Sequence, residues 1–327
     1  MSEPIGTAPR HALLRPDIAL PFLAVALIWG STWFVIKDGL GAAPPSWSVA
    51  YRFGIATIGM FVLAAISNRR SGRRGFSMTA GGHLMALLVG LSQFFGNFNF
   101  VYRAEIHLTS GIVAVLFGLL IVPNAILGSL FLGQPITRRF VAGSIVGIGG
   151  IVLLLVHEAA LAPPTGQVGL GIALTVCAIL SASTANVLQA TDTAKRRPLH
   201  LLLAWAMLWG TVANVALAWA LNGAPVLPTS PRYWGGVTYL ALIGSVVTFP
   251  LYFRLIRDLG PGRAAYNGVM VPVVAMALST LFEGYVWSPL AAGGAALTMV
   301  GLIVALRGRA APMRQPPAER QASSPLR

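Results

Sequence analysis

Ten apolar segments run along the chain, each close to the length that a helix needs to cross a bilayer. A hydrocarbon core of about 30 Å takes roughly 20 helical residues. A soluble protein of this size would give shorter, amphipathic stretches instead. The pattern therefore predicts an all-α membrane protein with ten transmembrane helices. The predicted spans are 18–38, 46–66, 83–103, 108–132, 140–156, 168–189, 199–221, 233–254, 264–283 and 287–306.

The composition excludes a soluble fold and argues against nucleic acid as a partner. Charged residues make up 10% of the chain, against about 25% in a typical soluble domain. The net charge of +14 could suggest nucleic acid, but the basic residues occupy alternate loops rather than one face or one tail. We therefore expect a lipid bilayer around the protein. Cys177 is the single cysteine, so the chain forms no internal disulfide.

The distribution of Lys and Arg predicts that both termini lie in the cytoplasm. With the N-terminus inside, 19 of the 23 Lys and Arg residues fall on the inner side, whereas Lys37, Arg103 and Arg232 fall outside and Arg52 lies within a span. Removing one helix would destroy this alternation. The inner set is Arg10, Arg15, Arg69, Arg70, Arg73, Arg74, Arg138, Arg139, Lys195, Arg196, Arg197, Arg254, Arg257, Arg263, Arg307, Arg309, Arg314, Arg320 and Arg327.

The spans group into two halves that share a pattern. Pro123 precedes Gln134 by eleven residues, and Pro272 precedes Glu283 by the same number. Each pair is followed by a helix with two glycines seven residues apart. Between the two halves the proline pairs are offset by 149 residues and the glycine pairs by 151, which suggests a connecting loop about two residues longer in the second half. A unit of five helices is odd, so its copy must lie inverted in the membrane, as in many secondary transporters.

The predicted organisation has five parts. The expected segments are a cytoplasmic N-terminus at 1–17, a first five-helix repeat at 18–156, an external loop at 157–167, a second repeat at 168–306 and a disordered cytoplasmic tail at 307–327.

Several motifs resemble the drug/metabolite transporter superfamily, EamA type. They are the first span from Ala26 to Lys37, the Tyr51-Arg52-Phe53 run, and the units from Pro123 to Gly150 and from Pro272 to Gly301. The resemblance implies a bundle of two inverted repeats around a central cavity that opens alternately to each side. It also implies a metabolite, amino acid or drug-like solute, which is often exported. The sequence departs from the family at Gly133-Gln134, where an acidic residue is usual.

Arg52 is the most informative candidate for solute binding. A cation at the bilayer centre costs at least about 2.5–3.5 kcal/mol, so it is usually retained for a reason. Arg52 either faces the cavity and attracts an anionic group, or forms a structural pair with a helix-end carbonyl or with Asp38. Trp29, Thr32 and Trp33 share one helical face, which suits either an aromatic solute site or helix packing.

Further candidates come from polar side chains at membrane depth. Gln93 and Asn97 need partners there, from a neighbouring helix or a wet cavity. Tyr252, Tyr266 and Asn267 are weaker candidates of the same kind. The glycines at positions 143, 147, 150, 294 and 301 indicate close helix packing, either within the protomer or in a homodimer.

No catalytic, metal or nucleotide-binding motif is recognisable, so the sequence predicts no enzyme and no cofactor. We expect a secondary transporter of a small organic solute in a bacterial inner membrane. Glu105 and Glu283 lie at predicted span ends and give proton coupling little support. The alternatives are a membrane sensor or scaffold and, less favoured, a lipid-modifying enzyme. The solute, the direction of transport, the coupling ion and the oligomeric state stay open.

Overall fold

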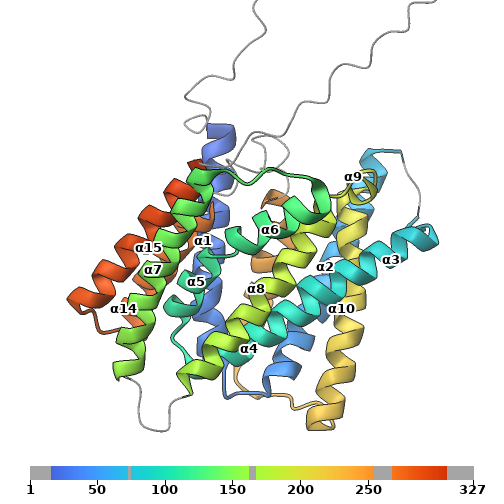
Figure 1. Cartoon of the computed structure of the whole chain (residues 1–327). Helices are drawn as coiled ribbons and strands as arrows, with labels where there is room; N and C mark the ends of the chain where they lie inside the picture. Colours follow the sequence, from blue (N-terminus) through green and yellow to red (C-terminus); the bar gives the residue numbers. More distant parts are fainter. Residues whose placement is uncertain (1–15, 73–74, 162–166, 253–266, 308–327) are drawn as a thin grey trace, which may run out of the picture.

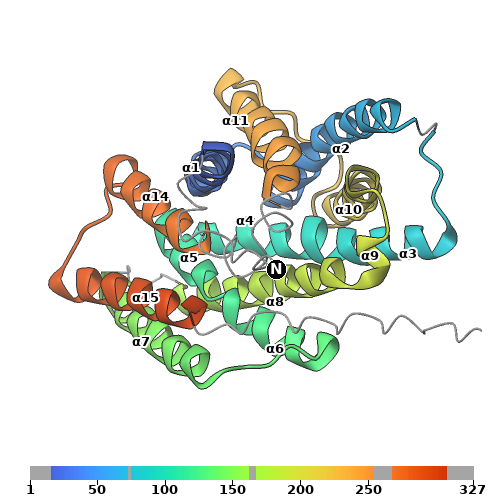
Figure 2. The ribbon, with the colours of Figure 1, turned by 90° about the horizontal axis from the view of Figure 1, so that it is seen from above.

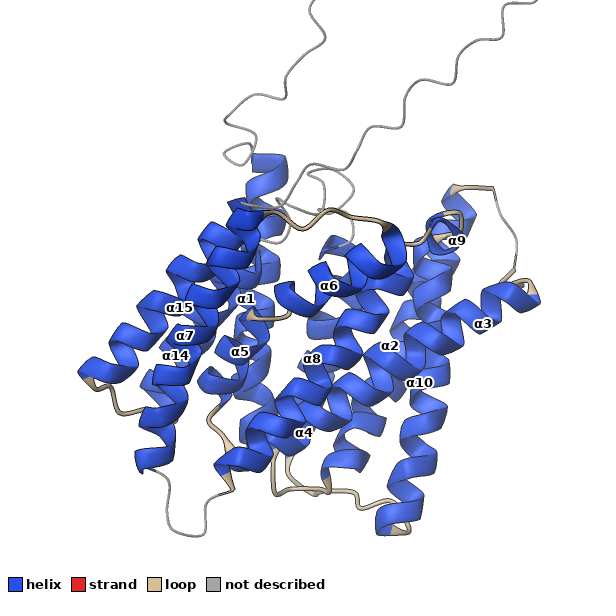
Figure 3. Cartoon of the chain, viewed as in Figure 1, coloured by secondary structure: helices blue, strands red, loops and turns tan. Residues whose placement is uncertain are grey.

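The computed structural model is built from helices throughout the residues that it describes, which are 16–72, 75–161, 167–252 and 267–307 (Figure 3). Their bounds are α1 Pro16–Gly39, α2 Pro45–Arg70, α3 Ala80–Val89, η2 Gly90–Asn97, α4 Phe98–His107, α5 Ser110–Gly118, α6 Ile121–Leu132, α7 Arg138–Leu161, α8 Val168–Ala190, α9 Asp192–Lys195, α10 Leu199–Asn222, α11 Pro231–Ala241, η3 Leu242–Val247, α14 Asn267–Phe282 and α15 Pro289–Arg307.

Eight spans in the described part of the chain are long and apolar enough to cross a membrane. Two shorter apolar helices, Gly268–Phe282 and Pro289–Ala305, accompany them. Many apolar side chains point outward, and Leu130 and Phe131 are each 72% exposed. Such exposure would be a liability in water but suits contact with lipid tails. The all-α membrane fold is therefore confirmed.

The third span is longer than its predicted range of 83–103. Helix α4 continues through Arg103 and Glu105 to His107, and the turn to α5 falls at positions 108–109. The helix continues because its polar groups find local partners: Arg103 donates to the backbone and side-chain oxygens of Asn99, one turn earlier. The prediction from polarity, which ended this span at residue 103, therefore placed the helix end too early.

The fourth span is divided rather than continuous. Helix α5 ends at Gly118, and α6 begins at Ile121 with Pro123 in its first turn. Proline has no backbone N–H, so it cannot donate to the carbonyl four residues earlier, which is that of Leu119. Tighter bonds take over at the break: Leu119 donates to Leu116, and Val122 donates to Leu119.

Helices from the two halves of the chain interleave. Helix α2 packs along α10, α7 along α15, α4 along α8, and α14 against both α1 and α5. Figure 2 shows these partners side by side when the bundle is viewed from above. The largest hydrophobic core joins α2, η2 and α10 through Phe53, Met60, Phe94 and Met207. In Figure 1, the start of α1 and the end of α15 lie at the same side of the bundle.

The helix ends show how the two halves correspond. Gly133 follows α6 with φ +63°, and Gln134 donates its backbone N–H to the carbonyl of Gly128. Gly284 follows α14 with φ +68°, and Tyr285 donates in the same way to Ser279. Both helices thus end in the same glycine cap, in a left-handed conformation that glycine adopts without strain.

The glycine caps align the two halves differently from the prolines used in the prediction. Gly133 and Gly284 are 151 residues apart, as are Gly143 and Gly294, so the spacing from the glycine cap to the glycines of the next helix is the same in both halves. The second loop, 283–288, is one residue longer than the first, 133–137, and not two as predicted. The two-residue difference in offset lies inside the helix, where the proline stands two residues further from its cap in α14 than in α6. Gln134 and Glu283 are therefore not equivalent positions.

Glu283 links the end of α14 to the start of α5. Its carboxylate accepts hydrogen bonds from the backbone N–H of Ser110 at 3.1 Å, from the Ser110 hydroxyl, and from the hydroxyl of Ser279 at 3.1 Å. The first turn of a helix leaves N–H groups unpaired and carries partial positive charge. A carboxylate from another helix satisfies both needs here.

Glu283→Ala is therefore expected to destabilise the protein by about 0.5–2 kcal/mol, the usual effect of losing a helix cap. Glu283→Gln keeps an acceptor oxygen and should lose less. Thermal unfolding in detergent would compare the two variants with the wild type. Equal melting temperatures for all three proteins would contradict the capping role.

Candidate functional site

Two π-helical turns lie at matching places in the two halves. Segment η2 occupies the middle of the third span, and η3 occupies the middle of the span that begins with α11. Phe94 of η2 contacts Phe249, just after η3, with ring centroids 5.4 Å apart. A π-turn is rare, and it often marks a functional site because it re-aims side chains and loosens backbone bonding.

Two asparagine side chains donate hydrogen bonds to backbone carbonyls of η2. Asn214 of α10 is fully buried and donates to the carbonyl oxygen of Phe94 at 3.0 Å. Asn99 donates to the carbonyl oxygen of Phe95 at 2.9 Å and to the side-chain oxygen of Asn214 at 2.6 Å. Within a bilayer such carbonyls have no water to bond to, so these amides stabilise the irregular turn.

Segment η3 holds Arg52. The hydroxyl of Ser245 donates to the carbonyl of Leu240 at 2.9 Å, five residues back along the π-turn. This places its oxygen against Arg52 of α2, whose Nε and Nη2 lie 3.4 and 3.3 Å away. The guanidinium also lies over the ring of Phe98, 4.3 Å from its centroid, in the geometry of a cation–π contact.

Arg52 is nonetheless incompletely satisfied. It is 1% exposed, and its Nη1 has no hydrogen-bond partner among the described residues. Asp38, the acid suggested as its partner, pairs with Arg232 instead. The two bonds to Ser245 share one neutral oxygen, and no carboxylate in the described ranges forms an ion pair with this cation. The arrangement leaves a buried donor available to an anion.

Trp29 and Thr32 lie beside this arginine. Trp29 donates its indole N–H to the carbonyl oxygen of Gly244 at 3.3 Å, and its ring contacts Phe249 and Tyr252. A Cβ on Gly244 would lie 2.9 Å from Thr32 Cγ2 and 3.7 Å from Arg52 Nη2. The glycine therefore lets η3 approach α1 and α2 closely enough to bring these predicted residues together.

The other predicted residues do not form one cluster with Arg52. The ring of Trp33 is tilted by 53° against that of Phe117 of α5, with centroids 4.9 Å apart, and its buried indole N–H has no acceptor in the described ranges. Gln93 and Asn97 are both buried in η2. Tyr266 lies outside the described residues.

Asn267 is the first residue of α14, and the structure does not describe its side chain. Sequence reasoning passed over Ser245 and Asn214, which hold Arg52 and the π-turn. The only signal for them was a polar residue inside an apolar span, which fits simple helix packing equally well.

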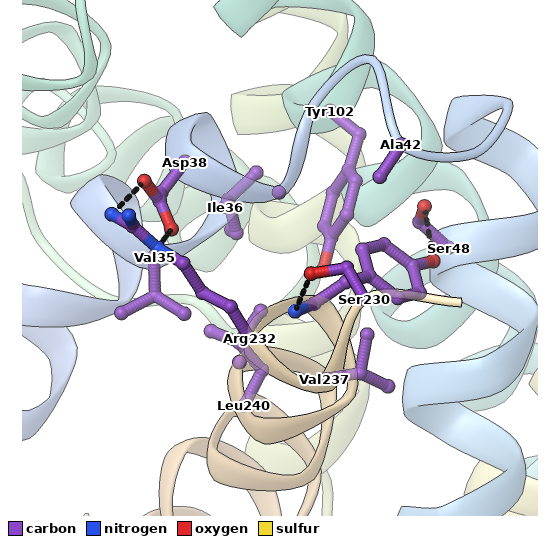
Figure 4. A pocket seen from close by; sticks show the side chains of 13 residues that line it. Val35, Ile36, Asp38, Ala42, Ser48, Tyr102, Ser230, Arg232, Val237 and Leu240 are labelled. Carbon is purple, nitrogen blue, oxygen red and sulfur yellow. Dashed lines mark hydrogen bonds and ion pairs between the residues drawn. The ribbon is translucent and has the colours of Figure 1, made fainter. Parts of the chain in front are cut away.

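A small pocket opens beside the end of α1 (Figure 4). Its volume is about 90 Å³, well below the roughly 300–1,000 Å³ of typical ligand pockets. At roughly 30 Å³ per water it holds a few waters rather than an organic solute. None of the predicted solute-binding residues lines it. Its walls are Val35, Ile36, Asp38, Gly39, Ala42, Ser48, Tyr102, Ser230, Arg232, Tyr233, Gly236, Val237 and Leu240.

The ion pair between Asp38 and Arg232 lies at the edge of this pocket and joins α1 to α11. Arg232 donates to both carboxylate oxygens, at 2.6 and 3.0 Å, and its side chain is 77% exposed. Exposed ion pairs contribute roughly 0.2–1 kcal/mol. The contact is therefore weak enough to break and re-form readily.

A double-mutant cycle with Asp38→Asn and Arg232→Gln is expected to give a coupling energy of roughly 0.2–1 kcal/mol that shrinks as salt is added. Unfolding at low and high ionic strength would measure it. A larger coupling that is insensitive to salt would show that the pair is shielded from solvent and acts as a fixed structural bond.

The model of the EamA-like transporter family matches residues 18–156 and 169–307, one match in each half of the chain. The chain belongs to the EamA-like transporter family. Two interleaved helical halves with π-turns at matching positions therefore form an EamA-type transporter, as the sequence resemblance implied.

Several relatives of this EamA protein carry transporter names. It is 24% identical over 296 residues to a probable amino-acid metabolite efflux pump of Salmonella typhimurium, covering 88% of this chain and 93% of that protein. It is 27% identical over 282 residues to a probable terminal-alkyne amino-acid exporter of Streptantibioticus cattleyicolor, with 84% and 89% covered. It is 29% identical over 265 residues to the uncharacterized inner membrane transporter YedA of Escherichia coli strain K12, with 80% and 81% covered.

A solved structure shares the fold. A crystal structure superposes with a TM-score of 0.64 at 18% identity and covers 89% of this chain and 96% of that one. At this identity the likeness concerns the fold alone. Together with the family match, the apolar spans establish a multi-pass inner-membrane transporter of small solutes rather than an enzyme.

Proposed function

We propose that this EamA transporter exports amino acids or closely related solutes that carry a carboxylate. The observation that carries the proposal is Arg52, a buried guanidinium with one free donor nitrogen at the junction of α2, η3 and α4. Arginine binds a carboxylate through two parallel hydrogen bonds, and these charge-assisted bonds are about twice as strong as neutral ones. A solute carboxylate would supply the anion that this site lacks.

The surroundings of Arg52 favour a partly apolar solute. Trp29, Phe98, Phe249 and Tyr252 provide aromatic surfaces close by, and Thr32 adds a hydroxyl. Solute sites are typically apolar with a few placed polar groups. Relatives named as amino-acid exporters support the same substrate class and the outward direction.

The same proposal includes ten helices with both termini inside. The alternation of Lys and Arg supports this orientation, since 19 of the 23 fall on one side. Residues 18–156 and 168–306 are then inverted repeats, and the connecting segment at 157–167, whose first five residues continue α7 to Leu161, lies outside. The solute site lies at their interface near mid-membrane, as in other transporters with inverted repeats. Gln93, Asn97, Trp33, Tyr266 and Asn267 are proposed to complete the cavity when it opens.

A solute panel tests this function. Purified protein would be screened for thermal stabilisation by L-amino acids, their methyl esters, nucleosides, sugars and cationic drugs. Each hit would then be assayed for counterflow in proteoliposomes at equal pH on both sides. We expect amino acids to stabilise and exchange, and their esters, which lack the carboxylate, to do so poorly. Exchange of sugars or cations but not of amino acids would contradict the proposal.

A further inference from the structure

Glu105 is a fully buried carboxyl group without a hydrogen-bond partner. It is 0% exposed, and neither carboxylate oxygen has a donor within the described parts of the chain. It lies in the last turn of α4, near a span end as predicted, yet it is sealed from solvent. Burying an ionised carboxylate without partners is far more costly than burying the neutral acid. A group in such a position has to be explained.

Lys37 lies beside Glu105 but forms no ion pair with its carboxylate. Lys37 of α1 donates to the backbone carbonyls of Glu105 and of Leu108, the latter at 2.9 Å, and so satisfies the end of α4. Its ammonium is therefore bound to the backbone beside the carboxyl group rather than to the carboxylate. After a modest movement of Lys37, its ammonium would leave a backbone carbonyl and bind the carboxylate of Glu105.

Few other charges act on this carboxyl group. Lys37 on α1, Arg52 on α2 and Glu283 after α14 are the charged residues that interact with it electrostatically, and Tyr102 lies one turn earlier on α4 itself. Helices α5 and α8 and segment η2 also pack against α4, and they contain no Asp, Glu, Lys, Arg or His. The environment therefore holds two cations and one acid, and the acid Glu283 is already bonded to Ser110.

The small pocket brings water close to this group. Tyr102 forms one of its walls, as Figure 4 shows, and Tyr102 and Glu105 share a face of α4 because they are three residues apart. The opposite edge of the pocket is the exposed Arg232. The pocket thus reaches from the exposed Arg232 to Tyr102, one helical turn from Glu105.

We infer that Glu105 binds and releases the proton that drives transport, so that the protein exchanges its solute for protons. In this arrangement a protonated carboxyl group avoids the cost of an unpaired negative charge in the interior. When the bundle rearranges, release of the proton leaves a carboxylate that Lys37 or water can stabilise. The pocket lies at the end of α1 that the proposed topology places outside, where an exporter would take up its protons. This inference rests on the proposed export function.

Proton movement with and without Glu105 tests the inference. Wild type, Glu105→Gln and Glu283→Gln would be reconstituted in liposomes containing a pH-sensitive dye. The probe is the L-amino acid that exchanges fastest in the panel. Wild type should move protons when this amino acid is added and should accumulate it when a pH gradient is imposed. Glu105→Gln is expected to lose both responses while it retains counterflow at equal pH, because counterflow needs no net proton movement.

Glu283→Gln is the matched control, since it neutralises a nearby carboxyl group that already has partners; it should keep proton coupling. Accumulation driven by the pH gradient in Glu105→Gln would overturn the inference. So would a wild type that exchanges the amino acid in counterflow but neither moves protons when the amino acid is added nor accumulates it under a pH gradient, a result that needs no variant and leaves the export function intact. Absence of counterflow in the wild type would instead reject the function on which the inference rests.

Discussion

Replacing Arg52 with methionine is expected to abolish transport of amino acids at physiological concentrations while the protein still inserts and folds. Methionine has a similar length and removes the charge. Losing charge-assisted hydrogen bonds to a carboxylate costs about 2–3 kcal/mol, which corresponds to roughly 30- to 150-fold weaker binding. Counterflow kinetics in proteoliposomes would measure this as a raised KM.

The control for this variant is Arg103→Met. Arg103 is also an arginine within a span, but its guanidinium bonds only to Asn99 of its own helix in the hydrogen bonds seen here. Removing its charge should leave solute affinity close to that of the wild type. The pair of variants therefore separates the loss of any membrane arginine from the loss of the one at the proposed site.

A second readout separates solute binding from a structural role of Arg52. The wild type should strongly prefer an amino acid to its methyl ester, because only the free acid pairs with the guanidinium. Arg52→Met should lose this preference and treat both compounds alike. If the variant instead retains the preference but transports both compounds more slowly, Arg52 stabilises the bundle through Ser245 and Phe98 and does not contact the solute.

The sequence predicted the membrane fold well because segment length in a bilayer is a strong constraint. The range 46–66 falls within α2, and 199–221 within α10. The predicted helix bounds failed where a local interaction outweighs the polarity or the apolar length of the segment. Helix α4 runs past Arg103 because Asn99 accepts its hydrogen bonds, and the span at 108–132 divides near Pro123 because proline cannot donate. The repeat register needed the glycine caps, which only backbone geometry shows.

The candidate site was less predictable, for a different reason. Arg52 was identified from its cost in a membrane, and Trp29 and Thr32 from helical spacing. Ser245 could not be identified in this way, because its contact with Arg52 depends on the π-turn at η3, and nothing in the sequence there distinguishes five-residue from four-residue bonding. Glu105 was placed at a span end, and its burial depends on how α1 and α4 pack together.

Gly150→Ala is expected to be among the most destabilising single substitutions in the chain. Helices α7 and α15 pack backbone to backbone, and a Cβ on Gly150 would lie 2.6 Å from the carbonyl oxygen of Gly294 and 2.5 Å from Thr298 Oγ1. The helices would have to separate, as in an overpacked core, at about 1–3 kcal/mol or more. The glycine stripe that could have served a homodimer is thus used within the protomer.

Gly149→Ala, one residue earlier on α7, provides the matched control. A Cβ there meets no atom within 4 Å, so this substitution should be neutral or should stabilise by roughly 0.5–1 kcal/mol, because alanine restricts the unfolded backbone. In detergent, Gly150→Ala should therefore lower the melting temperature, whereas Gly149→Ala should leave it unchanged or raise it. Equal shifts would show that α7 and α15 do not meet along Gly150, and the seam would then be free to pack against a second copy of the protein.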